Sequence, residues 1–178
     1  ALPISIVKSV CEEDDDSVIK QFIDVVECSA LAPLLKNGFN DIITLSLSII
    51  SKPEDEVSDD NKQLALEVVI SLIETHPGLL RKLATKCKQS GAPDPVEGTI
   101  QACIHLIQMV DDDEEWLTTD KEDDTDIKSN SLTGEASIDR LACALRGGVV
   151  LPRITALLPG LMSSSNWQQR YEIGRAHV

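Results

Sequence analysis

The chain has 178 residues, a formal net charge of −14 at pH 7, 42% hydrophobic residues and only 3% aromatic residues. A core with so few aromatic residues is built from Leu, Ile, Val and Ala, which favours packed helices over a β-sandwich or β-barrel. The acidity argues against nucleic acid as a partner, because phosphates repel such a chain, and it points to basic protein partners.

Two amphipathic helices, each followed by the same short sequence pattern, are predicted in the first half of the chain. The first is capped at Asp16 or Ser17 and the second follows Asn61, and both have apolar residues at helical spacing. Each is followed by a proline and a leucine pair, at Pro33 and at Pro77. The helix starts and the prolines both repeat after about 45 residues, which is within the period of HEAT and armadillo arrays. The pattern therefore predicts stacked helical hairpins.

Residues 38–50 should form the second helix of the first hairpin, although their pattern is mixed. Apolar residues from Ile43 to Ile49 alternate with Thr and Ser, which is the period of a strand. A set that includes Phe39 and Ile50 also fits the helical period, and a lone strand between helices would have no partner strand. We therefore predict a helix here.

The second hairpin ends in a helix with a compact start signal. In Asp94-Pro95-Val96-Glu97 the Asp suits the N-cap, the Pro suits the first helical position, and the Glu can bond back to the cap. This helix is expected over residues 95–110, with residues 88–95 as the loop before it. The acidic segment, residues 111–126, follows with ten Asp or Glu residues and one Lys, a local charge of −9.

A further hairpin follows the acidic segment, with helices expected over residues 135–145 and 149–162 and the glycine pair at 147–148 as the turn between them. Pro159 should kink the second of them. In helical arrays, a loop between units tolerates a long insertion without disturbing the core. The acidic segment is therefore interpreted as an insertion at a junction between hairpins.

The chain is thus predicted to be all-α, an α-solenoid of about three and a half HEAT hairpins with an acidic loop insertion. The second helix of each hairpin should line the concave face. Residues 172–178, EIGRAHV, back-translate to a common sequencing adapter, and we expect them to be an artefact. The expected segments are the end of a preceding HEAT helix at 1–15, HEAT repeats at 16–51, 59–110 and 134–164, the acidic insertion loop at 111–133, and the start of a further repeat at 165–171.

Four segments, in this order and spacing, resemble the importin-beta-like karyopherins, closest to the importin beta-3 branch: DNKQLALEVVISLIET with LLRK, MVDDDEEW, GEASIDRLACALRGGVVLP, and NWQQR. The resemblance implies an internal fragment of a nuclear import receptor, a superhelix of HEAT repeats that shuttles between cytoplasm and nucleus. The implied partners are cargo proteins with basic nuclear localisation signals, the GTP form of the Ran GTPase, and phenylalanine-glycine nucleoporins. A HEAT-repeat scaffold for a multiprotein complex, without a transport role, is the alternative.

The resemblance also implies that part of the acidic loop meets basic surface on Ran or cargo, on the inner side of the arch. From the residues alone, a solvated spacer is the alternative for the acids, and Trp116 can either anchor a partner or seal the preceding helix. Trp167 and Arg170 are expected to pack one hairpin on the next, and Asn166 stands where relatives usually have Asp. The residues carried over to the acidic loop are Asp111, Asp112, Asp113, Glu114, Glu115 and Trp116.

Neither a catalytic site nor a metal or cofactor site is expected. Residues 120–130 lack the central Gly and the closing Glu of an EF-hand loop. The three histidines pair with no Cys at zinc-ligand spacing, and neither GxSxG nor a phosphate-binding glycine loop occurs. Five cysteines without a CxxC pair indicate reduced packing residues, and no apolar run reaches the roughly 18 residues of a membrane span. We expect a binding protein and not an enzyme.

Overall fold

The structure, a computed structural model, describes residues 20, 23–24, 32–53, 55–109, 130–166 and 170. No strand occurs among these residues, so the all-α prediction is confirmed for the described part of the chain. None of the described helices is long and apolar enough to cross a membrane. The helices are α3 (Ala32–Ile50), α4 (Asp59–Thr75), α5 (Pro77–Ser90), α6 (Pro95–Ile107), α7 (Asn130–Leu145) and α8 (Gly147–Met162).

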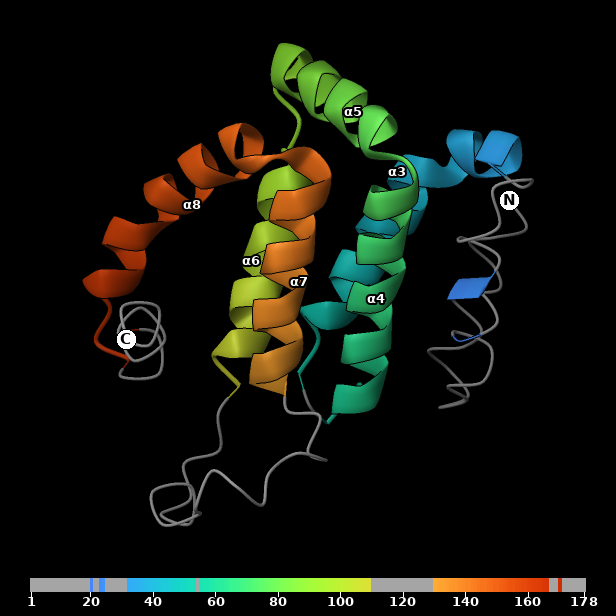
Figure 1. Ribbon diagram of the computed structural model, residues 1–178. Coiled ribbons are helices and arrows are strands. Elements are labelled where there is room, and N and C mark those ends of the chain that lie inside the picture. Colours follow the sequence, from blue (N-terminus) through green and yellow to red (C-terminus); the bar gives the residue numbers. More distant parts are fainter. Residues whose placement is uncertain are drawn as a thin grey trace.

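The helices are arranged in two layers around one core. α4 packs against α7 in one layer and α3 against α6 in the other, while the pairs α3–α4 and α6–α7 join the layers. Figure 1 shows α5 crossing one end of this bundle and α8 leaving from the same end. Burial of each large aliphatic side chain contributes about 1.5–3 kcal/mol, so this core dominates stability. Its fully buried members include Ile42, Ile43, Leu66, Ile70, Ile73, Leu80, Ile100, Leu106 and Leu141.

The start of α6 follows the sequence signal in two of its three parts. The carboxylate of Asp94 accepts a hydrogen bond from the backbone N–H of Val96 at 2.9 Å, and Pro95 is the first helical residue. Glu97 does not bond back to the cap in the expected way. Its carboxylate instead accepts a hydrogen bond from the side chain of Gln101, with 3.3 Å between Nε2 and Oε1.

The helix predicted over residues 38–50 is confirmed, and α3 begins six residues earlier, at Ala32. One of the serines that suggested a strand, Ser48, satisfies its hydroxyl within the helix by donating to the Leu45 carbonyl at 2.6 Å. Ser46 is buried beside the apolar core. Tertiary packing of the aliphatic residues thus overrides the local alternation.

α5 was not predicted, because the sequence indicated only a proline-leucine link and a loop from residue 88. Only Leu80 and Ala84 of this helix are buried, so its apolar pattern is too short to stand out. It ends at Gly91, whose φ of 70° lies in the left-handed region that favours glycine. As a result, α4 and α6, which were assigned to one hairpin, are separated by a helix and barely touch.

α6 and α7 form the most extensive helix pair among the described residues. α7 begins at Asn130, so it includes residues 130–133, which were assigned to the acidic insertion. The two helices approach closely at Gly134, where an added Cβ would lie 2.6 Å from the carbonyl oxygen of Cys103. Residues 110–129 therefore connect two helices that pack on each other, where a junction between separate hairpins was expected.

α8 lies within two residues of the expected range 149–162. It continues as one helix through Pro152 and Pro159, and Figure 1 shows it curving away from the bundle. Val150 is its one buried residue within the part that the structure describes, while Leu151 and Met162 are exposed. α8 is thus held to the bundle mainly at its first turn.

Candidate partner-binding site at the base of the acidic segment

The predicted partner-binding residues, Asp111 to Trp116, lie outside the described residues. Their flanks are described, since Met109 follows the end of α6 and Asn130 opens α7. Because α6 and α7 pack side by side, both flanks lie at one end of the bundle, away from α5 (Figure 1). This end of the bundle is the base from which the acidic segment leaves and to which it returns.

Asn130 joins three elements at the base. Its side-chain oxygen accepts a hydrogen bond from Nε2 of Gln63 on α4 at 2.8 Å. Its side-chain nitrogen lies 3.9 Å from the sulfur of Met109, within reach of a weak hydrogen bond. The residue that opens α7 therefore ties the start of this helix to α4 and to the end of α6.

A buried lysine lies beneath the base. Lys62 on α4 is only 1% exposed, and its Nζ lies 3.6 Å from the carboxylate of Asp59. Burial lowers the pKa of His105 on α6, and the positive charge of Lys62 lowers it further. Because a buried ammonium group is costly without nearby negative charge, Lys62 suits a base that carries many acids.

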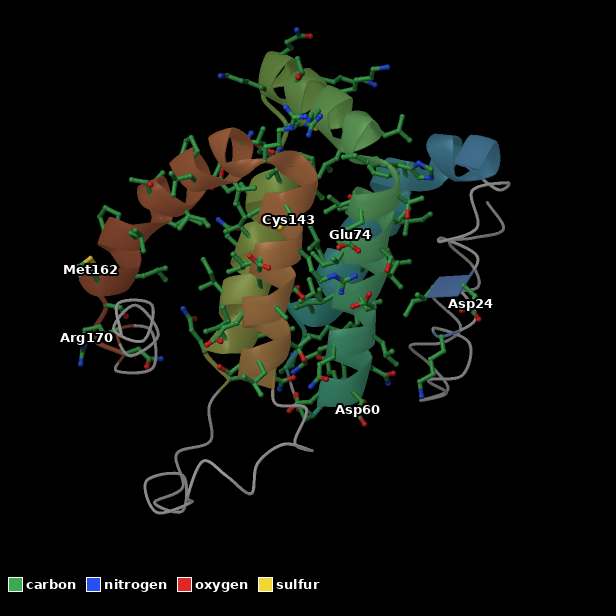
Figure 2. All side chains as sticks on the ribbon, viewed as in Figure 1. Asp24, Asp60, Glu74, Cys143, Met162 and Arg170 are labelled. Atoms are coloured by element: carbon green, nitrogen blue, oxygen red, sulfur yellow. The ribbon has the colours of Figure 1, made fainter. Side chains whose placement is uncertain are left out.

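Exposed acidic residues of α4 and the turn before it add to the negative charge at this end: Asp55, Glu56, Asp59 and Asp60. Figure 2 labels Asp60 at the foot of α4, beside the start of α7. The N-termini of α4 and α7 both lie here, and their partial positive charges offset some of the repulsion between carboxylates. The base can therefore hold a high density of negative charge.

An arginine clamp fixes α7 on α4 above the base. The guanidinium of Arg140 forms two hydrogen bonds with Glu67, at 2.7 and 2.8 Å, and two with Glu74, at 2.7 and 3.0 Å. Hydrogen bonding from Arg140 lowers the pKa of Glu67 despite its partial burial. The same bonds to Glu74 and Glu67 raise the pKa of Arg140. This bidentate pairing sets the position of α7 along α4.

A second arginine ties α8 to the start of α6. Arg153 donates to Oδ2 of Asp94 from Nε at 2.9 Å and from Nη2 at 2.6 Å. Asp94 also caps α6 through its other oxygen, so one carboxylate serves both contacts. These two arginines give the bundle a rigid frame on which the flanks of the acidic segment are held.

The residues expected to pack hairpins together are only partly described. Trp167 lies outside the described residues, and Arg170 is exposed and donates to the Ser164 carbonyl at 2.5 Å. Their packing role stays a prediction. Within the described residues, no group of three or more His, Cys, Asp or Glu residues could hold a metal ion.

Sequence reasoning missed the residues that position the base. Glu67 and Glu74 are seven residues apart, a spacing that puts two carboxylates on one face of a helix and that could have suggested a shared arginine. Nothing in the sequence singled out Gln63 or Asn130, because their contact joins segments 67 residues apart.

Comparison with known proteins agrees with this arrangement. A family model described as an importin repeat matches residues 54–152. The fold is similar to that of Kap121p, in a crystal structure of Kap121p bound to Nup53p, with a TM-score of 0.73 and 20% sequence identity. The similarity covers 96% of this chain and 16% of the Kap121p chain, so this chain spans a small part of that protein. The fold is therefore a helical solenoid of the HEAT type.

Proposed function

The chain belongs to the importin-repeat family, and from this premise we propose that it is a segment of a nuclear import receptor that shuttles between cytoplasm and nucleus. The match with the importin repeat covers more than half of the chain, and the acidic segment falls inside it. This match is the observation that carries the proposal. The similarity of the fold to that of Kap121p is consistent with the proposed receptor class.

The acidic segment is proposed to bind basic surface on cargo or on Ran in its GTP form, through Asp111, Asp112, Asp113, Glu114 and Glu115. Its charge of −9 steers a Lys/Arg-rich partner and raises the rate of association. The exposed acids of α4 at the base extend this negative field. Trp116 is proposed either to anchor the partner or to cover the end of α6.

Release of cargo is proposed to follow from competition. If Ran in its GTP form and a basic cargo signal use the same acidic surface, binding of one weakens binding of the other. Phenylalanine-glycine nucleoporins are the third partner class of the proposal, and the binding of Nup53p by Kap121p is consistent with a nucleoporin partner. Direction of transport then depends on where the GTP form of Ran is abundant.

Substitution of the five acids tests the role of the segment. In the intact protein, replacing residues 111–115 by Ser and Asn should slow association with a basic signal peptide by about tenfold at low salt. The difference should shrink near physiological salt, where charges separated by more than about 8 Å are screened. Equal binding at every salt concentration would support the spacer interpretation.

A matched control removes exposed carboxylates outside the segment. Asp41→Asn on α3 combined with Asp139→Asn on α7 should leave association with the peptide nearly unchanged. Both variants should melt at temperatures close to that of the unsubstituted protein, because exposed substitutions rarely change stability by more than about 0.5 kcal/mol. A loss of binding confined to the 111–115 variant would then report on the acidic segment and not on the fold.

The alternative function is a HEAT-repeat scaffold that holds a multiprotein complex together without transporting it. Capture of the intact protein by immobilised Ran, locked in its GTP or its GDP form, separates the two functions. The receptor should be retained by the GTP form alone. Equal retention by both forms, or by neither, would favour the scaffold.

A further inference from the structure

α5 presents an exposed basic face in an otherwise acidic chain. The helix carries four basic residues and no acidic residue, whereas the net charge of the chain is −14. Figure 2 shows side chains of α5 with nitrogen tips that point away from the helices below it. The basic face consists of Arg81, Lys82, Lys86 and Lys88, all of which are exposed.

The lysines of this face lack the ion pairs that other cations of the bundle form. Arg140 and Arg153 are each held by carboxylates at 2.6–2.7 Å. Within the described part of the chain, no carboxylate forms an ion pair with Lys82, Lys86 or Lys88. Their charges are therefore available to a ligand.

Folding does not account for the charges at Lys82 and Lys86. Like charges four residues apart on a helix repel each other, and cations are favoured near the C-terminus, which explains Lys88 alone. Arg81 has a structural contact, because its Nη2 donates to the carbonyls of Ala144 and Leu145 at the end of α7, each at 3.2 Å. The lysines add nothing comparable to the fold.

Helical geometry arranges the four cations in two rows. Arg81 and Lys88 are seven residues apart and share one side of α5, while Lys82 and Lys86 are four apart and share the neighbouring side. In an extended peptide, successive side chains point to opposite sides. Side chains on the same side recur after about 6.7 Å, which is close to the roughly 6 Å rise from Lys82 to Lys86. Between the rows lies an exposed uncharged stripe of Gly78, Thr85 and Gln89.

We propose that the basic face of α5 binds an extended run of consecutive acidic residues in a partner protein. The run lies along the uncharged stripe. The carboxylates on one side of the run meet one basic row, and those on the other side meet the other row. A long polyanion such as nucleic acid fits less well, because the negative charge on the rest of the chain repels what extends beyond this short helix. The inference does not depend on the proposed transport function.

The chain itself contains two runs of five consecutive acids, residues 12–16 and 111–115. α5 adjoins the start of α6, and Met109 follows the other end of that 13-residue helix, about 20 Å away. The described flank of the second run therefore lies at the opposite end of α6 from the basic face. The proposed occupant is an acidic run in another molecule, which is not tethered to this chain.

The test uses the intact protein and a fluorescently labelled peptide of eight glutamates, with anisotropy as the readout at low salt. The variant Lys82→Gln with Lys86→Gln should bind the peptide about tenfold more weakly, since it loses two surface ion pairs. Lys82→Arg with Lys86→Arg should keep the affinity. The matched control, Lys20→Gln with Arg170→Gln, removes two exposed cations elsewhere and should also keep it.

Three outcomes would overturn the proposal. The first is equal peptide affinity for the Gln variant and the unsubstituted protein, which would make the face merely solvated. The second is tighter binding of a single-stranded oligonucleotide than of the peptide, with the oligonucleotide affinity lost in the Gln variant. The third is self-association in sedimentation velocity that the Gln variant abolishes, which would assign the face to a second copy of the chain.

Discussion

Gly134→Ala should destabilise the bundle at the contact that brings the two flanks of the acidic segment together. A Cβ at this position would lie 2.6 Å from the carbonyl oxygen of Cys103 and 2.6 Å from Cγ1 of Ile107. Ordinary contacts of a Cβ begin at 3.4 Å, so α6 and α7 must separate by about 0.8 Å at this point. The obstructing carbonyl belongs to the backbone of α6 and cannot rotate away.

The expected magnitude follows from two opposing terms. Alanine is favoured over glycine inside a helix by about 1 kcal/mol. Overpacking of a well-packed contact costs about 1–3 kcal/mol, and contact with backbone belongs at the upper end of that range. The free energy of unfolding should therefore fall by about 1–2 kcal/mol, which lowers the melting temperature of a chain of this size by about 2–8 °C.

Urea denaturation followed by far-UV circular dichroism measures this change, and Gly160→Ala is the matched control. Gly160 also lies in a helix, α8, but nothing lies within 4 Å of a Cβ added there. The control should be unchanged or stabilised by up to about 1 kcal/mol. If Gly134→Ala matched the control in stability, with an unchanged dependence on urea, the close contact between α6 and α7 would be refuted.

Three further predictions concern the arginine clamp and the cysteines. Arg140→Met should lower the free energy of unfolding by about 1–2 kcal/mol, a value that allows for the partial exposure of the ion pairs. Arg140→Lys should lower it less, because lysine keeps the positive charge but cannot pair with two carboxylates. Urea denaturation measures both changes. Because the pKa of Glu67 is lowered from 4.5 in the folded chain, its pairing stabilises the fold above that pH and is lost as the pH falls through the folded value. Thermal melts from pH 7 to pH 3 should show this loss, and it should be smaller in Arg140→Met. Burial raises the pKa of Cys103 to about 12, so a thiol reagent at pH 8 should label the exposed Cys143 before Cys103, as peptide mass spectrometry can show.

The sequence predicted a helix start well where that start depends on residues next to it in the chain. The Asp-Pro start of α6 and the glycine pair at the start of α8 depend on residues within one turn, so both boundaries follow closely from the sequence. α5 escaped prediction because two buried residues suffice to hold it across the end of the bundle. The pairing of α6 with α7 also escaped, because it depends on close approach at Gly134, far along the chain from Cys103.

In the candidate site too, some features depend on the residues themselves and others depend on contacts between distant parts of the chain. Charge is a property of the residues themselves, so the sequence raised an electrostatic role for the acidic segment, with a solvated spacer as the alternative. The choice of residues 111–116 came from the resemblance to karyopherins, and it stays a prediction. The anchors of the segment are contacts between distant helices, such as Gln63 with Asn130, and no short pattern encodes them. The basic face of α5 was visible only after α5 itself was known to be a helix.

Release of a bound basic cargo from the intact protein tests the proposed receptor function. A fluorescently labelled protein with a basic nuclear localisation signal is bound to the receptor, and Ran is then added in its GTP or its GDP form. The proposed receptor should release the cargo with the GTP form and retain it with the GDP form. Cargo that stays bound with both forms of Ran would contradict the proposed competition between cargo and Ran.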